Sequence, residues 1–192
     1  MKKQSILSEK LEPIKGVLYF VMIVLLSHFF WKFFVLGDET DTTITLFGWD
    51  ISYPFNYAST HVAEITHKVL NKIGYNTSLN SSNIIRHINT GHSAQVVWGC
   101  TGIKQAYIFF CIIAFYYGSW KHKLWYIPLG FLLIYLVNLL RITLLMAIIQ
   151  KYPNSFDFWH EQVTKYLFYI FLFGLWVVWN ENFVLKRKER RA

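Results

Sequence analysis

Three residues of this sequence have side chains suited to one reaction, although they lie far apart in the chain. Cys100 carries a thiol, Arg141 a guanidinium and His160 an imidazole, and each lies at or near the end of an apolar stretch. A thiolate can attack a carbonyl carbon, an imidazole can move protons, and a guanidinium can stabilise an oxyanion. These are the groups that a cysteine-based acyl-transfer site requires, provided that the fold brings them together.

The residues around Cys100 read Trp98-Gly99-Cys100-Thr101-Gly102 and directly precede an apolar stretch. We expect Cys100 to open a helix there, because free backbone N–H groups and the positive end of the helix dipole favour a thiolate. The same N–H groups can hold an oxyanion, and the two glycines allow the backbone to approach a substrate closely. The alternative is that Cys100 is a small apolar residue filling a helix interface, as many buried cysteines are.

The other two residues also have polar neighbours that fit a catalytic role. Asn138 precedes Arg141 by three residues and therefore shares a helix face with it. Arg141 would hold the scissile carbonyl or the developing oxyanion; the alternative is an interfacial arginine paired with a loop acid. His160 would protonate the leaving amine and be oriented by Asp157 or Glu161; the alternative is an interfacial histidine among aromatic residues.

The remaining histidines offer fewer reasons for a catalytic role. His122 lies in a loop that the charge pattern assigns to the cytoplasm, whereas His87 and His92 flank a predicted hairpin and stay open as alternatives. His61 and His67 are six residues apart rather than four, so they do not form a helical zinc pair. We therefore expect no metal and no cofactor.

The composition indicates a membrane protein. Hydrophobic residues make up 54% of the 192 residues and aromatic residues 19%, which is too many large apolar side chains for the interior of a soluble domain of this size. Apolar runs of about 18 or more residues predict spanning helices. We predict a single all-α integral membrane domain over residues 1–192, in contact with lipid, with about four transmembrane helices. The predicted spans are residues 16–36, 102–118, 124–148 and 163–183, and the apolar sequence of the third is interrupted by Pro128, Asn138 and Arg141.

The one long segment between spans, residues 37–101, predicts a small extracytoplasmic element. Residues 43–47 alternate like a short strand, and residues 84–88 and 93–98 flank a turn, as in a β-hairpin that leads to Cys100. Residues 58–73 predict an amphipathic helix that lies on the membrane or on the other helices. Its apolar face is expected to consist of Val62, Ile65, Val69 and Ile73.

The basic residues predict the topology. The net charge is +8, but Lys and Arg cluster just outside the apolar runs, which the positive-inside rule explains better than a nucleic-acid groove does. Residues 1–15, 121–123 and 186–191 hold four, two and five of the 19 Lys and Arg residues. Both termini are therefore expected in the cytoplasm. This topology places Cys100, Arg141 and His160 at the opposite membrane surface.

Other functional classes find less support. The sequence contains no GxSxG, Walker A or GxGxxG motif. Cys111 follows Cys100 by eleven residues. That spacing is about 16 Å along a helix, too far for a disulfide, so a membrane thiol oxidoreductase is disfavoured. A non-catalytic membrane scaffold of a polysaccharide or secretion assembly remains the main alternative to an enzyme.

The three segments resemble the exosortase/archaeosortase family of membrane cysteine transpeptidases. The family pattern has Cys-(Ser/Thr)-Gly opening one helix, Asn-x-x-Arg in a later helix, and His followed by an acid before the last helix. Here these elements read Cys100-Thr101-Gly102, Asn138-Leu139-Leu140-Arg141 and His160-Glu161. The likeness covers about residues 96–183. The chain has fewer N-terminal helices than the longer members, and its short form is similar to the exosortases of Bacteroidetes-type bacteria, for instance the F type.

The resemblance implies that Cys100 is the nucleophile and that Arg141 and His160 are its catalytic partners. It also implies the substrates: exported proteins whose C-terminal sorting signal combines a short motif, a hydrophobic helix and a basic tail. Such signals would be cleaved through a cysteine thioester at the outer face of the bacterial inner membrane. The acyl group would then pass to a surface acceptor.

Overall fold

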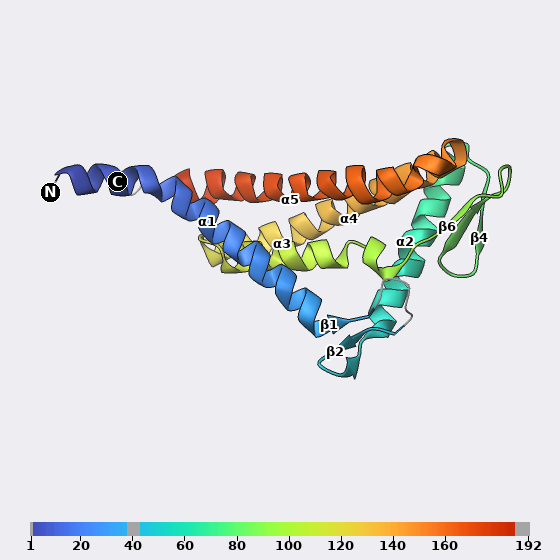
Figure 1. Cartoon of the computed structure of the whole chain (residues 1–192), viewed down its shortest axis with the longest axis horizontal. Coiled ribbons are helices and arrows are strands. Elements are labelled where there is room, and N and C mark those ends of the chain that lie inside the picture. The colour runs from blue at the N-terminus through green and yellow to red at the C-terminus, as the bar shows by residue number, and fades with distance from the viewer. Residues whose placement is uncertain (1, 38–42, 187–192) are drawn as a thin grey trace.

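The computed structural model shows long helices packed side by side, with two small three-stranded sheets (Figure 1). The structure describes residues 2–37 and 43–186, with side chains from residue 14 onward. Most of the predicted basic tail, residues 187–191, lies outside the described residues. The helices are α1 Lys2–Phe34, α2 Ser52–Lys72, α3 Ile103–Phe115, α4 Trp120–Lys151 and α5 Lys165–Trp179.

Three helical stretches of the described chain are long and apolar enough to cross a membrane. They cover Ile14–Phe34, Trp120–Lys151 and Phe158–Leu185. The last consists of α5 and the π-helical segments Phe158–Thr164 and Asn180–Leu185 at its two ends. An all-α membrane protein is therefore confirmed. Helix α4 covers the third predicted span and continues through Pro128 without a break.

The predicted second span is shorter than expected. Helix α3 has 13 residues and is therefore about 20 Å long, less than the roughly 30 Å of a hydrocarbon core. It contacts α1, α4 and α5, and Phe109, Ile112 and Ile113 are at most 1% exposed. Because other helices surround α3, it forms the centre of the bundle.

Close packing of α3 against α4 depends on a glycine. A Cβ atom on Gly130 would lie 2.1 Å from Cζ of Phe109. No heavy atom can occupy that space while the Phe109 ring stays where it is. The C-terminal end of α3 is closed by buried Lys123. Its Nζ donates to the carbonyl oxygens of Ala114 at 2.8 Å and Tyr116 at 2.7 Å, so the last carbonyls of α3 are satisfied by a cation.

The segment between α1 and α3 contains the predicted hairpin and more strands than expected. Strands β4 and β5 pair antiparallel, and β5 pairs antiparallel with β6. The predicted short strand at residues 43–47 forms β2, the middle strand of the other sheet. The strands are β1 Val35–Leu36, β2 Thr45–Leu46, β3 Trp49–Asp50, β4 Thr77–Asn80, β5 Ile84–His87 and β6 Ser93–Gln95.

The predicted helix of residues 58–73 is present as α2, but its predicted apolar face is wrong in part. Val62 is buried, whereas Val69 is 38% and Ile73 58% exposed. Helix α2 packs against α4 and β4, and small polar side chains fit this contact as well as aliphatic ones do. The buried residues are Ser52, Phe55, Ser59, Val62, Ala63, Thr66 and Leu70.

The helix ends fall into two groups along the long axis of the molecule (Figure 1). The start of α1, the turn between α3 and α4, and the end of α5 lie toward one end. The starts of α3 and α5, the end of α4, helix α2 and the sheet β4–β6 lie toward the other. Because Cys100 precedes α3, Arg141 lies in the last third of α4 and His160 precedes α5, all three reach the second end.

Candidate active site

Cys100 lies in a tight turn before α3, not at the first turn of an α-helix. Residues 98–100 form a 3₁₀ turn, and α3 begins at Ile103. The N–H of Cys100 donates to the carbonyl of Val97 at 2.9 Å, and the N–H of Thr101 donates to that of Trp98 at 3.1 Å. The expectation of N–H groups free to hold an oxyanion is therefore wrong for Cys100 and Thr101.

Asn138 fixes the Cys100 turn to α4. Asn138 is fully buried, and its Nδ2 donates to the backbone carbonyl of Cys100 at 2.9 Å. Gly102 has φ +83°, and a Cβ there would lie 3.3 Å from Cγ of Asn138. Glycine suits both the left-handed backbone and this contact. The Thr101 hydroxyl donates to the Trp98 carbonyl at 2.6 Å, which holds the turn together from inside.

The imidazole of His160 contacts the thiol. Cys100 Sγ and His160 Nε2 are 3.5 Å apart, and His160 Nδ1 lies 3.0 Å from Glu161 Oε1. The other carboxylate oxygen of Glu161 accepts from Lys165 Nζ at 3.3 Å. Of the two acids considered from the sequence, Glu161 is the one that orients the ring. His160 lies within the π-helical segment Phe158–Thr164, which continues directly into α5.

Arg141 joins the same group through a residue that the sequence analysis did not single out. Its Nε donates to the hydroxyl of Thr164 at 3.1 Å, and that hydroxyl donates to the carbonyl of His160 at 3.2 Å. Thr164 is 8% exposed, so water competes little with these bonds. The sequence offered one signal for Thr164. It follows His160 by four residues, which places both residues on one helix face.

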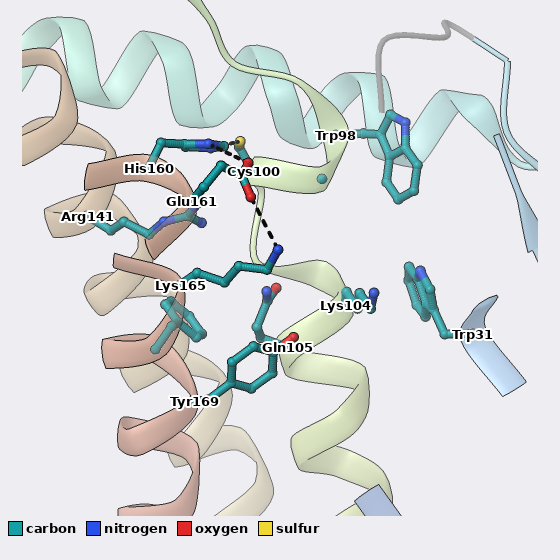
Figure 2. Close-up of a pocket in the computed structure, with 12 residues that line it drawn as sticks. Trp31, Trp98, Cys100, Lys104, Gln105, Arg141, His160, Glu161, Lys165 and Tyr169 are labelled. Atoms are coloured by element: carbon teal, nitrogen blue, oxygen red, sulfur yellow. Dashed lines mark hydrogen bonds and ion pairs between the residues drawn. The ribbon is translucent and has the colours of Figure 1, made fainter. Parts of the chain in front are cut away.

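A cavity of about 130 Å³ opens beside the thiol. Figure 2 shows Arg141, His160 and Glu161 approaching Cys100 from one side, with Lys104 and the two tryptophans on the other. Three cationic side chains and one carboxylate line the cavity, so its charge is net positive. A substrate oxygen that gains negative charge would be stabilised there. The lining charged residues are Lys104, Arg141, Glu161 and Lys165.

Two residues that could have competed for a catalytic role, His87 and Cys111, are buried in the fold. His87 is fully buried, and its Nε2 bonds to the Met146 carbonyl at 2.8 Å, which attaches the sheet β4–β6 to α4. Cys111 is buried, and both it and Cys100 are free thiols. Among the described residues, no group of three or more His, Cys, Asp or Glu side chains is arranged to hold a metal ion.

A family model described as transmembrane exosortase (Exosortase_EpsH) matches residues 11–179. The chain therefore belongs to the transmembrane exosortase family, whose members are described as membrane-embedded, protein-sorting enzymes of the cysteine transpeptidase kind. No curated protein and no solved structure matches the chain. The catalytic roles of Cys100, Arg141 and His160 stay predictions, now with a defined geometry.

Proposed function

We propose that this protein is a membrane-embedded cysteine transpeptidase or peptidase that cleaves C-terminal sorting signals of exported proteins at the outer face of the bacterial inner membrane. The observation that carries the proposal is the 3.5 Å contact of the Cys100 thiol with the His160 imidazole, in a cavity that Arg141 also lines. A nucleophile within reach of a base, with the base oriented by a third group, is the arrangement that covalent acyl transfer needs.

In the first half-reaction, His160 Nε2 takes the proton of the Cys100 thiol, and the thiolate attacks the scissile carbonyl carbon. The C–S bond forms, and the carbonyl oxygen becomes an oxyanion. The Nε contact of Arg141 with Thr164 leaves the two Nη groups to stabilise that oxyanion, because a guanidinium carries five N–H donors. The imidazolium then gives its proton to the amide nitrogen, the C–N bond breaks, and the C-terminal fragment leaves as an amine.

In the second half-reaction, an amine or water attacks the thioester. His160 takes the proton of this nucleophile, and the returning C–S electron pair restores the thiolate, which regains a proton. An amine acceptor gives a transferred product and water gives a hydrolysed one. Glu161 stabilises the imidazolium in both halves, because its carboxylate already lies 3.0 Å from Nδ1.

The same proposal assigns sides to the membrane. The basic residues 121–123, in the first turn of α4, lie at the end of the bundle away from the site (Figure 1), and the positive-inside rule puts such a basic segment in the cytoplasm. Both termini are then cytoplasmic, and the site faces outward. A substrate's hydrophobic helix would lie in the lipid beside the bundle with its basic tail inside, so that its scissile bond is held at the depth of Cys100.

The test compares C-terminal peptides of exported proteins by quantitative mass spectrometry in host cells that lack the gene and carry a plasmid copy. Wild type and Cys111→Ala should both produce shortened C-termini, because Cys111 is a buried thiol of the bundle core. Cys100→Ala should produce none at unchanged membrane abundance. Equal processing in cells with wild type and Cys100→Ala would overturn the proposal.

A second variant separates the enzyme from a membrane scaffold. Arg141→Lys keeps the charge but replaces a planar fork with a point charge. We expect a loss of processing of about 10²- to 10³-fold, as for loss of an oxyanion donor. A scaffold would tolerate both this change and Cys100→Ala.

A further inference from the structure

Strand β6 has a free edge that ends near the thiol. In the sheet order β4-β5-β6, β6 pairs on one side with β5, and no other described strand pairs with it. The N–H of His87 donates to the carbonyl of His92, and that of Val96 to the carbonyl of Asn83. Since main-chain groups alternate in direction along a strand, those of residues 92, 94 and 96 face β5.

The main-chain groups of Ser93 and Gln95 therefore face away from the sheet, and both residues are exposed. An unpaired row of N–H and C=O groups is a template on which an extended peptide can add as a further strand. On the distal edge, by contrast, the N–H of Thr77 in β4 already donates to Asn71 Oδ1 at 2.9 Å. Position 95 is therefore the part of this sheet best placed to take a new strand near the site.

A second, small cavity connects this edge to the site. It has a volume of about 30 Å³, and its lining includes Ala94, Gln95 and Val96 together with Cys100 and His160. Its remaining lining residues are Ile142, Leu145, Met146 and Phe156, so the cavity lies between β6 and α4, next to the thiol. Cys100 and His160 line both this cavity and the larger cavity of the site.

The surfaces on either side of the Cys100 thiol suit the two parts of a substrate that flank the scissile bond. The sheet β4–β6 lies beyond the ends of α3 and α5 (Figure 1), where an exported protein would emerge from the membrane. The larger cavity is lined by residues of α1, α3, α4 and α5, including Phe168 and the exposed Tyr169, and a hydrophobic helix would enter there from lipid. A peptide that crosses Cys100 thus has its N-terminal part at the sheet and its C-terminal helix among the spans.

We infer that the substrate residues N-terminal to the scissile bond bind as an added β-strand on the free edge of β6, with the main-chain groups of Ser93 and Gln95 as partners. This inference rests on the proposed function and adds the substrate conformation to it. Recognition by main-chain bonds requires an extended substrate but few particular side chains, so the acyl side would tolerate varied sequences.

The first arm of the test removes one donor from the edge. Gln95→Pro deletes an N–H that faces away from β5, and proline is accepted at such edge positions. Gln95→Ala keeps the N–H and is the matched control. Because the two variants differ in the main-chain N–H, we expect Gln95→Pro to process about tenfold or more slowly than Gln95→Ala, and equal processing by the two variants would contradict the inference. Alkylation of Cys100 by iodoacetamide at the wild-type rate would show that the site of Gln95→Pro is intact.

The second arm leaves the enzyme unchanged, so it works even if Gln95→Pro does not fold. Synthetic peptides spanning a cleavage site, as defined by the C-terminal mass spectrometry, carry one backbone N-methyl group each. Purified wild-type protein should lose about tenfold or more in rate at every second position on the acyl side. Uniform or absent sensitivity there, with the unmethylated peptide cleaved, overturns the inference alone. No cleavage of the unmethylated peptide overturns the proposed function and this inference with it.

Discussion

The hydrogen-bonded chain Arg141–Thr164–His160 links the guanidinium that we propose binds the oxyanion to the imidazole that we propose acts as the base. One hydroxyl accepts from the guanidinium Nε and donates to the carbonyl of His160. It therefore sets where both groups lie relative to the thiol, without itself reaching the reacting atoms. Thr164 is a positioning residue in this account.

We predict that Thr164→Val lowers kcat by about 10- to 100-fold, as expected when a hydrogen bond to a charged group is lost. KM should change little, because Thr164 does not line either cavity at the thiol. Thr164→Ser keeps the hydroxyl and should recover most of the rate. Steady-state kinetics on a peptide substrate measures both constants, and equal kcat for the Val and Ser variants would contradict this role.

At the residue scale, the sequence identified the side chains but not how they are held. Cys100, Arg141 and His160 were singled out because each lies near the end of an apolar stretch, and the fold brings those ends together. Thr164 was missed because a threonine in a helix usually has no special partner. The predicted free N–H groups were wrong because they depended on an α-helical start, whereas the backbone forms a 3₁₀ turn that uses them.

Among the elements, the short helix α3 has the strictest packing requirement. Its Phe109 ring occupies the space beside Gly130 of α4. A methyl group there would either displace the ring or push the helices apart, and both helices carry site residues at their far ends. The fit of α3 into the bundle therefore affects the position of the Cys100 turn.

We predict that Gly130→Ala destabilises the protein by about 1–3 kcal/mol through overpacking. The added Cβ would lie 2.1 Å from the Phe109 ring, whereas one at Gly174 of α5 would meet no atom within 4 Å. Gly174→Ala is thus the matched control, and it should be neutral or stabilising, because alanine favours a helix more than glycine does. Thermal unfolding in detergent measures both, and the double change with Phe109→Leu should recover part of the loss.

Whether a segment forms a helix or a strand was easier to predict from the sequence than where that element ends and what packs against it. Long apolar runs predicted α1, α4 and α5, and the turn residues predicted the β5–β6 hairpin. Helix α3 is short because the backbone becomes extended at Tyr116. The apolar run in the sequence did not indicate that the helix ends there. The face of α2 was partly misassigned because its partner is another helix, against which Ser59 and Thr66 pack as well as larger residues do.

At the scale of the whole molecule, the account requires opposite ends of the bundle to face opposite compartments. Asn89, in the turn between β5 and β6, and His122, in the first turn of α4, are both exposed. They lie at the two ends and can each carry a reporter without disturbing a helix interior.

We predict that a membrane-impermeant maleimide labels Asn89→Cys in intact spheroplasts and labels His122→Cys only after the membrane is permeabilised. Both variants need a background of Cys100→Ala and Cys111→Ala, so that the introduced thiol is the only one in the chain. The physical reason is the cost of moving the basic turn across the membrane. The reverse labelling pattern would place the site in the cytoplasm and rule out exported proteins as substrates.

The central claim, that Cys100 carries the acyl group, has one direct measurement. Protein purified from cells at low pH, without amines or thiols, is digested and its Cys100 peptide examined by mass spectrometry. The account predicts a fraction of this peptide bearing an acyl adduct that hydroxylamine removes, and no adduct on Cys111. An unmodified Cys100 in cells that show shortened C-termini, or an adduct on another residue, would contradict the account.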